Sequence, residues 1–199
     1  MIKGKFMFKC EKNRIQQYLQ RLLAVAASVL LMFAGSVSAQ VTMETLLDRI
    51  QIEDLLVRYY YELSQGNAHE MAEYFTEDAL LDVDGTIAVG HDEIAALYTR
   101  PEGSEEAEAR ANRGVGHMLL TNSVIDVDGN NAVAHVLWTG VLNPGVGQAP
   151  NLYEQGREDT ALVKVNGKWL ISKRYISSDS GIPDKYDATY EPRGNPLAD

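Results

Sequence analysis

Two side chains in this sequence carry a reactive group at a position where the residue pattern can direct it toward the protein interior. His117 opens the run HMLLTNSV, whose apolar and polar residues alternate as in a β-strand. Its imidazole can act as a base or hydrogen-bond donor in a cavity, or it can bond a backbone carbonyl at a strand end. Tyr59 shares a helical stripe with Leu56 and Leu63, so its hydroxyl points inward. There it either polarises a carbonyl or leaving group, or it is a satisfied hydroxyl of the core.

Aromatic side chains mark two further positions. Tyr59, Tyr60 and Tyr61 lie about 100° apart on a helix, so at least one of them must face solvent or a partner surface. In the later run AVAHVLWTGVLN, His135 and Trp138 have opposite parity, so only one of them can line a cavity. We favour Trp138, because an aromatic wall suits an apolar ligand; ordinary core packing is the alternative.

The sequence lacks the residue motifs that several kinds of catalysis and cofactor binding need. The four histidines form no close pair and no H-x-x-x-H, and the only cysteine is Cys10. Neither a strand-to-helix glycine-rich phosphate loop nor a G-x-S-x-G elbow is present. We therefore expect no metal, no cofactor and no covalent cysteine or serine chemistry of these types.

The first 39 residues have the pattern of a secretory signal. Six basic residues precede the apolar run LLAVAASVLLMFAG, and small residues surround Ala39, after which we expect cleavage. A membrane anchor is the alternative, but the run is shorter than the roughly 20 residues that span a bilayer. We expect a secreted or periplasmic protein that has no membrane contact after cleavage.

The charge of the remaining chain excludes some partners. The full chain carries 18 basic and 28 acidic side chains, and removing the leader takes away six of the former and one of the latter, which leaves a formal charge of −15. Such a surface repels phosphate backbones and anionic lipids, so we expect no nucleic-acid partner.

The pattern along the chain predicts helices first and strands second. An amphipathic helix is expected from Thr42 to Leu63, a second in AHEMAEYFTED and a third in HDEIAALYT, with a short hairpin in ALLDVDGTIAVG between the last two. The rest reads as long antiparallel strands, with an Asn-Gly turn before KWLISKRYIS. This order predicts an α+β fold with helices packed on a strongly curved antiparallel sheet. We expect a signal at 1–39, one domain at 40–177 and a polar tail at 178–199, with residues 101–113 as a surface loop.

Residues 44 to 177 resemble the SnoaL-like proteins of the nuclear transport factor 2-like superfamily. The resemblance rests on IEDLLVRYYYELSQGNAHEMAEYFTEDALLDVDG, GHDEI, GHMLLTNSVIDVDGNNAVAH and REDTALVKVNGKWLISKR, in that order and spacing. It implies a cone-shaped α+β barrel with a small-molecule cavity. The superfamily holds dehydratases, isomerases, hydrolases, cyclases and non-catalytic binding modules, so the fold alone does not name an activity.

The dehydratase-like members imply a site for this chain. Their helix-1 tyrosine maps to Tyr59, their strand histidine to His117, and their aspartate to Ser64. Serine can orient an imidazole but supplies no negative charge, so His117 is predicted to be a weaker base than in those enzymes. Asp159 also lies in a segment that carries the resemblance, which makes it a site candidate. The alternative is that it pairs with Lys173 or Arg174 across the sheet.

These observations leave two functions open. The first is a cavity that binds a small apolar, oxygenated molecule, with cofactor-free lyase or isomerase chemistry in which His117 moves the proton, Tyr59 donates a hydrogen bond and Ser64 orients. Leu56, Leu119, Trp138 and Asp159 are then the ligand-binding candidates. The second is a non-catalytic binding or accessory module. A homodimer through the sheet, with VLWTGVL supplying the apolar face, is expected by analogy with the superfamily.

Overall fold

The computed structural model describes residues 41–65, 68–99, 114–181 and 194–197. The predicted signal segment, the loop 101–113 and most of the predicted tail lie outside these ranges. The elements follow in the order α2 (Met43–Gln65), η1 (Ala68–Tyr74), β1 (Phe75–Val83), β2 (Thr86–Val89), α3 (Gly90–Tyr98), β3 (Val115–Asp128), β4 (Asn131–Asn143), β5 (Asn151–Val165) and β6 (Lys168–Ser180). Among the described helices, none has the length and apolar character needed to span a membrane.

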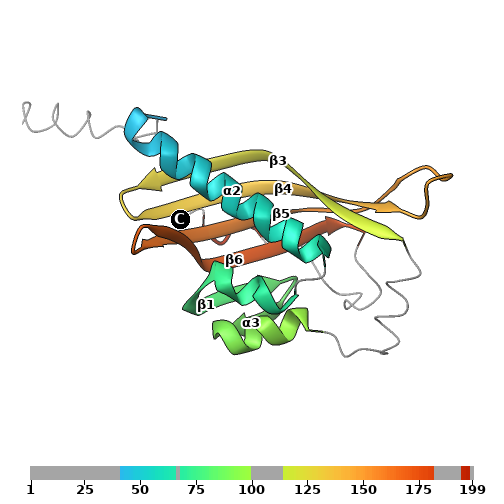
Figure 1. Ribbon diagram of the computed structural model, residues 1–199, viewed down its shortest axis with the longest axis horizontal. Helices are drawn as coiled ribbons and strands as arrows, with labels where there is room; N and C mark the ends of the chain where they lie inside the picture. The colour runs from blue at the N-terminus through green and yellow to red at the C-terminus, as the bar shows by residue number, and fades with distance from the viewer. Residues whose placement is uncertain (1–40, 66–67, 100–113, 182–193, 198–199) are drawn as a thin grey trace, which may run out of the picture. The chain divides into compact units, whose positions relative to one another are not determined.

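The six strands form one curved sheet in the order β2-β1-β6-β5-β4-β3 (Figure 1). The neighbours are antiparallel except β1 and β6, which run parallel. An entirely antiparallel sheet was expected, and this pair differs because β1 and β6 are not joined by a hairpin. The chain between them is long enough to return in either direction.

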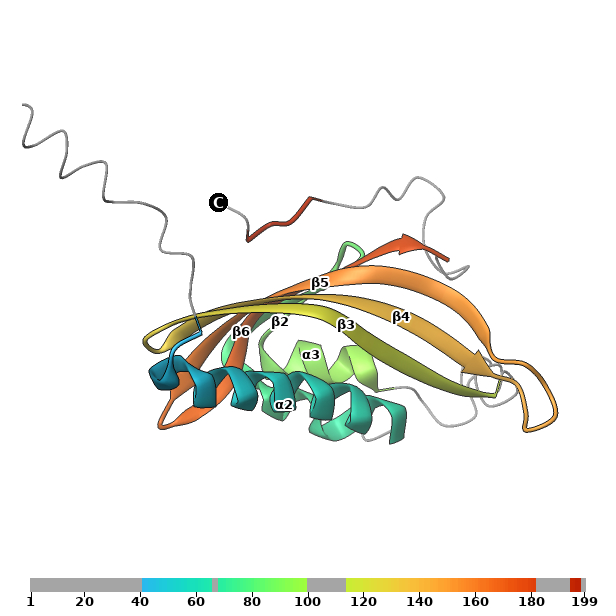
Figure 2. The ribbon, with the colours of Figure 1, turned by 90° about the horizontal axis from the view of Figure 1, so that it is seen from above.

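Both helices pack on the concave face of the sheet (Figure 2). The core lies between these layers, because the inward residues of the strands and the inner stripe of α2 are apolar. The largest apolar side chains that are less than 2% exposed are Ile52, Tyr59, Met71, Phe75, Leu81, Ile94, Leu162 and Ile171. The predicted α+β class and the curved sheet are confirmed.

Helix α2 begins where its sequence supplies a cap. The Thr45 amide donates to Thr42 Oγ1 at 3.2 Å, and the Thr42 amide donates back to Thr45 Oγ1 at 3.1 Å. This reciprocal arrangement satisfies backbone donors that a helix N-terminus leaves without partners. The predicted start at Thr42 is therefore correct to within one residue.

The second predicted helix is shorter than expected. It is a 3₁₀ helix that ends at Tyr74, and Phe75 already belongs to β1, where it pairs with Ile171 of β6. Sheet pairing and the burial of the Phe75 ring, which is 1% exposed, override the helical pattern of EMAEYF.

Two backbone features set the register of the long strands. Asn166 and Gly167 join β5 to β6 with φ values of 51° and 82°, as the predicted Asn-Gly hairpin requires. In β3 a bulge follows Thr121: Thr121 pairs with Leu137 and Val124 with His135, so β3 holds one more residue than β4 between these pairs. Asn122, inside the bulge, has a φ of 53°.

Candidate functional site

An ion pair lies completely buried on the concave face of the sheet. Arg174 Nη2 of β6 donates to Glu158 Oε2 of β5 at 2.5 Å, and both side chains are 0% exposed. The strand register explains why they meet. Thr160 pairs with Arg174 and Glu158 with Ile176, so all four face the same side of neighbouring strands. Two opposite charges are thus held in the core of the protein.

Three tyrosines from the helices complete this group. Tyr60 of α2 donates its hydroxyl to Glu158 Oε2 at 2.5 Å. The Arg174 guanidinium lies 3.9 Å from the centre of the Tyr59 ring, and the hydroxyls of Tyr59 and Tyr98 of α3 are hydrogen-bonded to each other. We call Tyr59, Tyr60, Tyr98, Glu158 and Arg174 the inner polar cluster.

The charges within the inner polar cluster are well defined. Burial disfavours ionisation and raises the pKa of both Tyr59 and Tyr60 well above the ordinary value, so their phenols are neutral. Burial is the largest influence on Arg174 and acts to lower its pKa, but the Glu158 carboxylate and the three tyrosines of the cluster together outweigh it, so the pKa is raised overall. Arg174 is therefore a permanent cation whose charge Glu158 balances.

Several polar atoms on this face lack a hydrogen-bond partner among the described residues. They are Glu158 Oε1, Arg174 Nε and Nη1, Thr160 Oγ1 and Trp138 Nε1. A buried polar atom without a partner costs about 1–3 kcal/mol, more when it is charged. The cluster, together with Thr160 and Trp138 on the same face, thus offers donors and acceptors that a small bound molecule or water would satisfy.

The structure places only part of the predicted site near this cluster. Tyr59 belongs to it, and Leu56 lies buried one helical turn away. Trp138 is 3% exposed on the same face, and its ring lies against Gly156 of β5, where an added Cβ would come within 2.6 Å of it. The ligand-binding roles of Leu56 and Trp138 remain predictions.

His117, Leu119 and Ser64 lie elsewhere. His117 pairs with Val141 and is exposed, and Leu119 on the same face of β3 is 51% exposed. Ser64 is exposed near the end of α2 and donates its hydroxyl to the Tyr61 carbonyl at 2.7 Å. The structure therefore does not bring His117 and Ser64 together with Tyr59, and their catalytic roles stay predictions.

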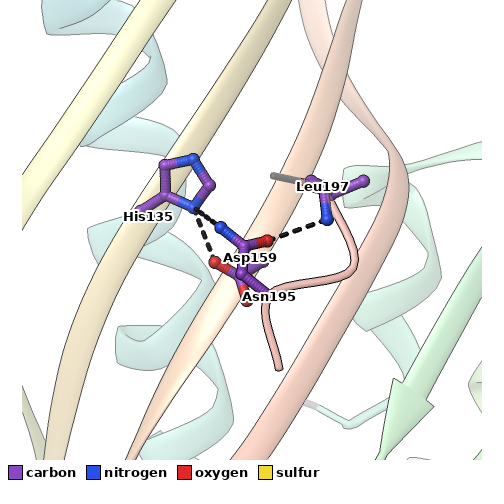
Figure 3. A network of polar contacts seen from close by, with 4 residues as sticks. All are labelled: His135, Asp159, Asn195 and Leu197. Atoms are coloured by element: carbon purple, nitrogen blue, oxygen red, sulfur yellow. Dashed lines mark hydrogen bonds and ion pairs between the residues drawn. The ribbon is translucent and has the colours of Figure 1, made fainter. Parts of the chain in front are cut away.

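Asp159 is buried on the opposite, convex side of the sheet. His135 Nδ1 donates to its carboxylate at 2.6 Å, and Asn195 of the C-terminal segment lies 3.2 Å from the same nitrogen (Figure 3). Its partner is thus a histidine on β4 instead of Lys173 or Arg174. This contact joins residues 194–197 to the back of the sheet, away from the inner polar cluster.

Two further buried acids near the β1–β2 turn accept hydrogen bonds from the backbone. Asp84 accepts hydrogen bonds from the Ser178 amide at 2.6 Å and from the Ser178 hydroxyl at 2.8 Å. Asp82 accepts from the Gly85 amide at 2.9 Å. Within the described ranges no three histidine, cysteine, aspartate or glutamate side chains gather in a way that could hold a metal ion.

A groove of about 450 Å³ opens on another side, between α2, η1 and the β5–β6 turn. Its charged lining includes Asp54 and Arg58, which already pair with each other at 2.7 Å. Among its lining residues in the described ranges, none carries a buried polar atom without a partner. We therefore take the inner polar cluster as the candidate site.

Comparison with known proteins identifies the family. The sequence model of the SnoaL-like domain matches residues 44–175. This chain belongs to the SnoaL-like domain family. The comparison of this chain with curated proteins found no match.

Solved structures share the fold of this SnoaL-like protein. An NTF2-like protein with a cystatin-like fold from Novosphingobium aromaticivorans is 22% identical, with 70% of this chain and 87% of that chain covered and a TM-score of 0.58. A putative scytalone dehydratase from the same organism is 20% identical, with 68% and 87% covered and a TM-score of 0.55. A putative aromatic ring hydroxylase, also from that organism, is 22% identical, with 71% and 93% covered and a TM-score of 0.53. At these identities the likeness establishes the fold alone.

Proposed function

We propose that this SnoaL-like protein binds a small, uncharged, oxygenated molecule at the inner polar cluster. The observation that carries the proposal is the set of buried donor and acceptor atoms that have no partner among the described residues. A fully buried ion pair is costly unless its remaining hydrogen-bonding capacity is used. A bound ligand supplies those missing hydrogen bonds.

The unpartnered atoms define the chemistry of the ligand. Arg174 Nε and Nη1 are donors and call for a carbonyl or ether oxygen, whereas Glu158 Oε1 is an acceptor and calls for a hydroxyl. Because Arg174 and Glu158 cancel each other's charge, an ionised ligand would be desolvated without a free counter-charge. A neutral hydroxyketone fits this pattern, and the rings of Tyr59 and Trp138 provide apolar surface beside it.

The test compares three probes of similar size: 3-hydroxycyclohexanone, cyclohexanone and cyclohexanecarboxylate. Titration calorimetry should rank their affinities in that order, with the carboxylate weakest. Thr160→Val removes one unpartnered hydroxyl without touching the ion pair, so it should weaken hydroxyketone binding while leaving stability unchanged or raised. Ser172→Ala on the same sheet is the matched control, since its hydroxyl already bonds the Ala161 carbonyl. Tightest binding of the carboxylate would contradict the proposal.

A second candidate function is cofactor-free proton transfer at the same site. It is favoured by Glu158 Oε1, a buried carboxylate oxygen without a partner among the described residues, beside the donors of Arg174. Glu158 would accept the proton from the carbon next to the ligand carbonyl, and Arg174 would stabilise the enolate oxygen until a proton returns. Tyr59, which lies against Arg174, keeps its proposed role as a hydrogen-bond donor.

Deuterium exchange at that carbon, followed by NMR in D₂O, tests this role. Glu158→Gln should abolish the exchange that the protein catalyses, whereas His117→Ala should leave it within a few fold. Exchange that is lost in His117→Ala and retained in Glu158→Gln would instead identify His117 as the base. Binding of the hydroxyketone without any exchange would leave the non-catalytic module as the function.

Export remains part of the proposal, on the strength of the N-terminal sequence pattern. Cleavage after Ala39 would leave Gln40 as the first residue of the mature chain. N-terminal sequencing of the protein recovered from the periplasm or medium of an expressing bacterium checks this, and a chain that retains Met1 in the cell would contradict it.

A further inference from the structure

The outer side of α2 carries an apolar stripe that no described element covers. Met43, Leu47, Ile50, Val57 and Tyr61 are between 52% and 87% exposed. They lie opposite the buried stripe of the same helix, and Figure 1 shows α2 in front of the sheet with its outer side toward the viewer. Tyr61 is thus the one of the three consecutive tyrosines that points away from the core. We call these five residues, together with Asp54 between them, the outer stripe.

The spacing of the outer stripe is that of a coiled-coil seam. The steps from Met43 to Leu47, Ile50, Asp54, Val57 and Tyr61 are four, three, four, three and four residues. This alternation keeps one face of a helix against a second helix over a length of about 27 Å, at 1.5 Å per residue. Scattered exposed apolar residues would show no such period.

We propose that the outer stripe pairs with the same stripe of a second copy of this chain, with the two α2 helices antiparallel. The spacing is palindromic, so a two-fold axis near the middle of the helix superposes the stripe on itself. Met43 then faces Tyr61 of the second copy, Leu47 faces Val57, and Ile50 faces Asp54. A closed two-fold dimer is the commonest assembly of identical chains.

The charge within the outer stripe, taken with those beside it, favours this direction. On one flank Glu44, Gln51 and Arg58 follow one another at seven-residue intervals, and all three are exposed. In an antiparallel pair each flank meets its own copy, so Glu44 of each chain faces Arg58 of the other and Gln51 faces Gln51, while on the opposite, solvated flank Glu53 faces Glu53. A parallel pair would form Glu53–Arg58 contacts, but it would place the two Asp54 carboxylates against each other in the seam, where like charges are screened less than on a solvated flank.

The competing surface is the convex face of the sheet. It also exposes apolar residues, among them Leu119 and Leu137, but these are flanked by polar side chains such as His117 and Thr139. The C-terminal segment bonds to His135 on this face (Figures 2 and 3). The superfamily analogy points to this sheet, whereas the pattern of exposed residues points to α2.

The size of the outer stripe predicts a weak dimer. A single helix pair of this length falls at or below the lower end of specific interfaces, which bury about 1,200 Å² in total. Sedimentation velocity on the full chain between about 1 and 100 μM should therefore show a monomer–dimer equilibrium. Leu47→Glu, at an exposed position, should raise the dissociation constant by about 100-fold. Leu119→Glu on the sheet should leave it within about twofold.

A charge exchange tests the direction of the helices. Glu44→Arg and Arg58→Glu should each raise the dissociation constant about tenfold, because each breaks two symmetric pairs, and the double variant should return to within about threefold of the original. Rescue of Arg58→Glu by Glu53→Arg instead would mean a parallel pair. The proposal would be overturned by rescue through Glu53→Arg, by a monomer throughout the concentration range, or by a dimer that is lost only with Leu119→Glu.

Discussion

Removing one member of the buried Glu158–Arg174 pair should destabilise the protein in a way that depends on which charge is left. In Arg174→Met the glutamate remains in the core, 0% exposed and without a counter-charge. It can escape only by taking up a proton. Protonating a carboxylate of ordinary glutamate pKa, about 4.3, costs about 3.7 kcal/mol at pH 7, which limits the loss of unfolding free energy to about 3–4 kcal/mol. At 2–4 °C per kcal/mol, the melting temperature should fall by about 6–16 °C.

The stability deficit of Arg174→Met depends on pH. The folded variant binds a proton that the unfolded chain releases above about pH 4.3, so its deficit relative to the wild type grows as the pH rises. At pH 5 the deficit should shrink to about 1 kcal/mol. Glu158→Gln instead leaves a guanidinium that cannot lose its proton, so its deficit should be similar at both pH values.

Urea unfolding followed by circular dichroism at pH 5 and pH 7 measures both variants. Arg157→Met is the matched control: it removes an arginine from the same pair of strands, but its partner Asp179 is 42% exposed, and the loss should stay below about 1 kcal/mol. For Arg174→Met, a loss of unfolding free energy below about 1 kcal/mol at pH 7, or one that is equal at the two pH values, would refute the prediction. It would mean that Glu158 is not a buried carboxylate whose charge Arg174 balances.

Three further outcomes follow from the structure. His117→Ala should leave hydroxyketone affinity within about twofold, because the side chain is exposed on β3; a tenfold loss in calorimetry would place it in the site. Hydrogen bonding from Lys164 is the main cause that lowers the pKa of Asp48, so the stability that this carboxylate contributes is present above its unfolded pKa near 3.9 and is lost as the pH falls through the lower folded value. Asp48→Asn should therefore flatten the dependence of the unfolding free energy on pH below about pH 4, as measured by urea unfolding. An unchanged pH dependence would contradict this role of Asp48. Gly167→Ala, at a φ of 82°, should cost about 1–2 kcal/mol in thermal unfolding, whereas Gly145→Ala in the β4–β5 turn, without a positive φ, should be nearly neutral.

Much of the fold could be predicted because local signals and tertiary packing agree. The Thr42 cap, the inward position of Tyr59 and the Asn166–Gly167 turn all follow from local chemistry, and each is seen in the structure. The parallel pairing of β1 with β6 could not be predicted, because no short-range signal specifies how strands far apart in the sequence align.

The candidate site was harder to predict than the fold. Glu158 and Arg174 are charged residues in strands, and such residues are nearly always expected at the surface. Their parity was the available signal: Glu158 and Thr160 alternate with Asp159, and Arg174 shares the inward parity of its strand. That signal becomes decisive only when the strand register is known, since a shift of one residue exchanges the two faces.

The bulge in β3 has a genetic consequence. Because β3 carries one extra residue between Thr121 and Val124, the two halves of the strand present opposite parities to the same face. Deleting the codon for Asn122 while Ile125 stays packed in the core would rotate the preceding half, so that His117 and Leu119 would turn toward α2, and Met118 and Leu120 toward solvent. A single in-frame deletion could thus bring an imidazole into the interior without any amino-acid replacement, and a single insertion could remove it again.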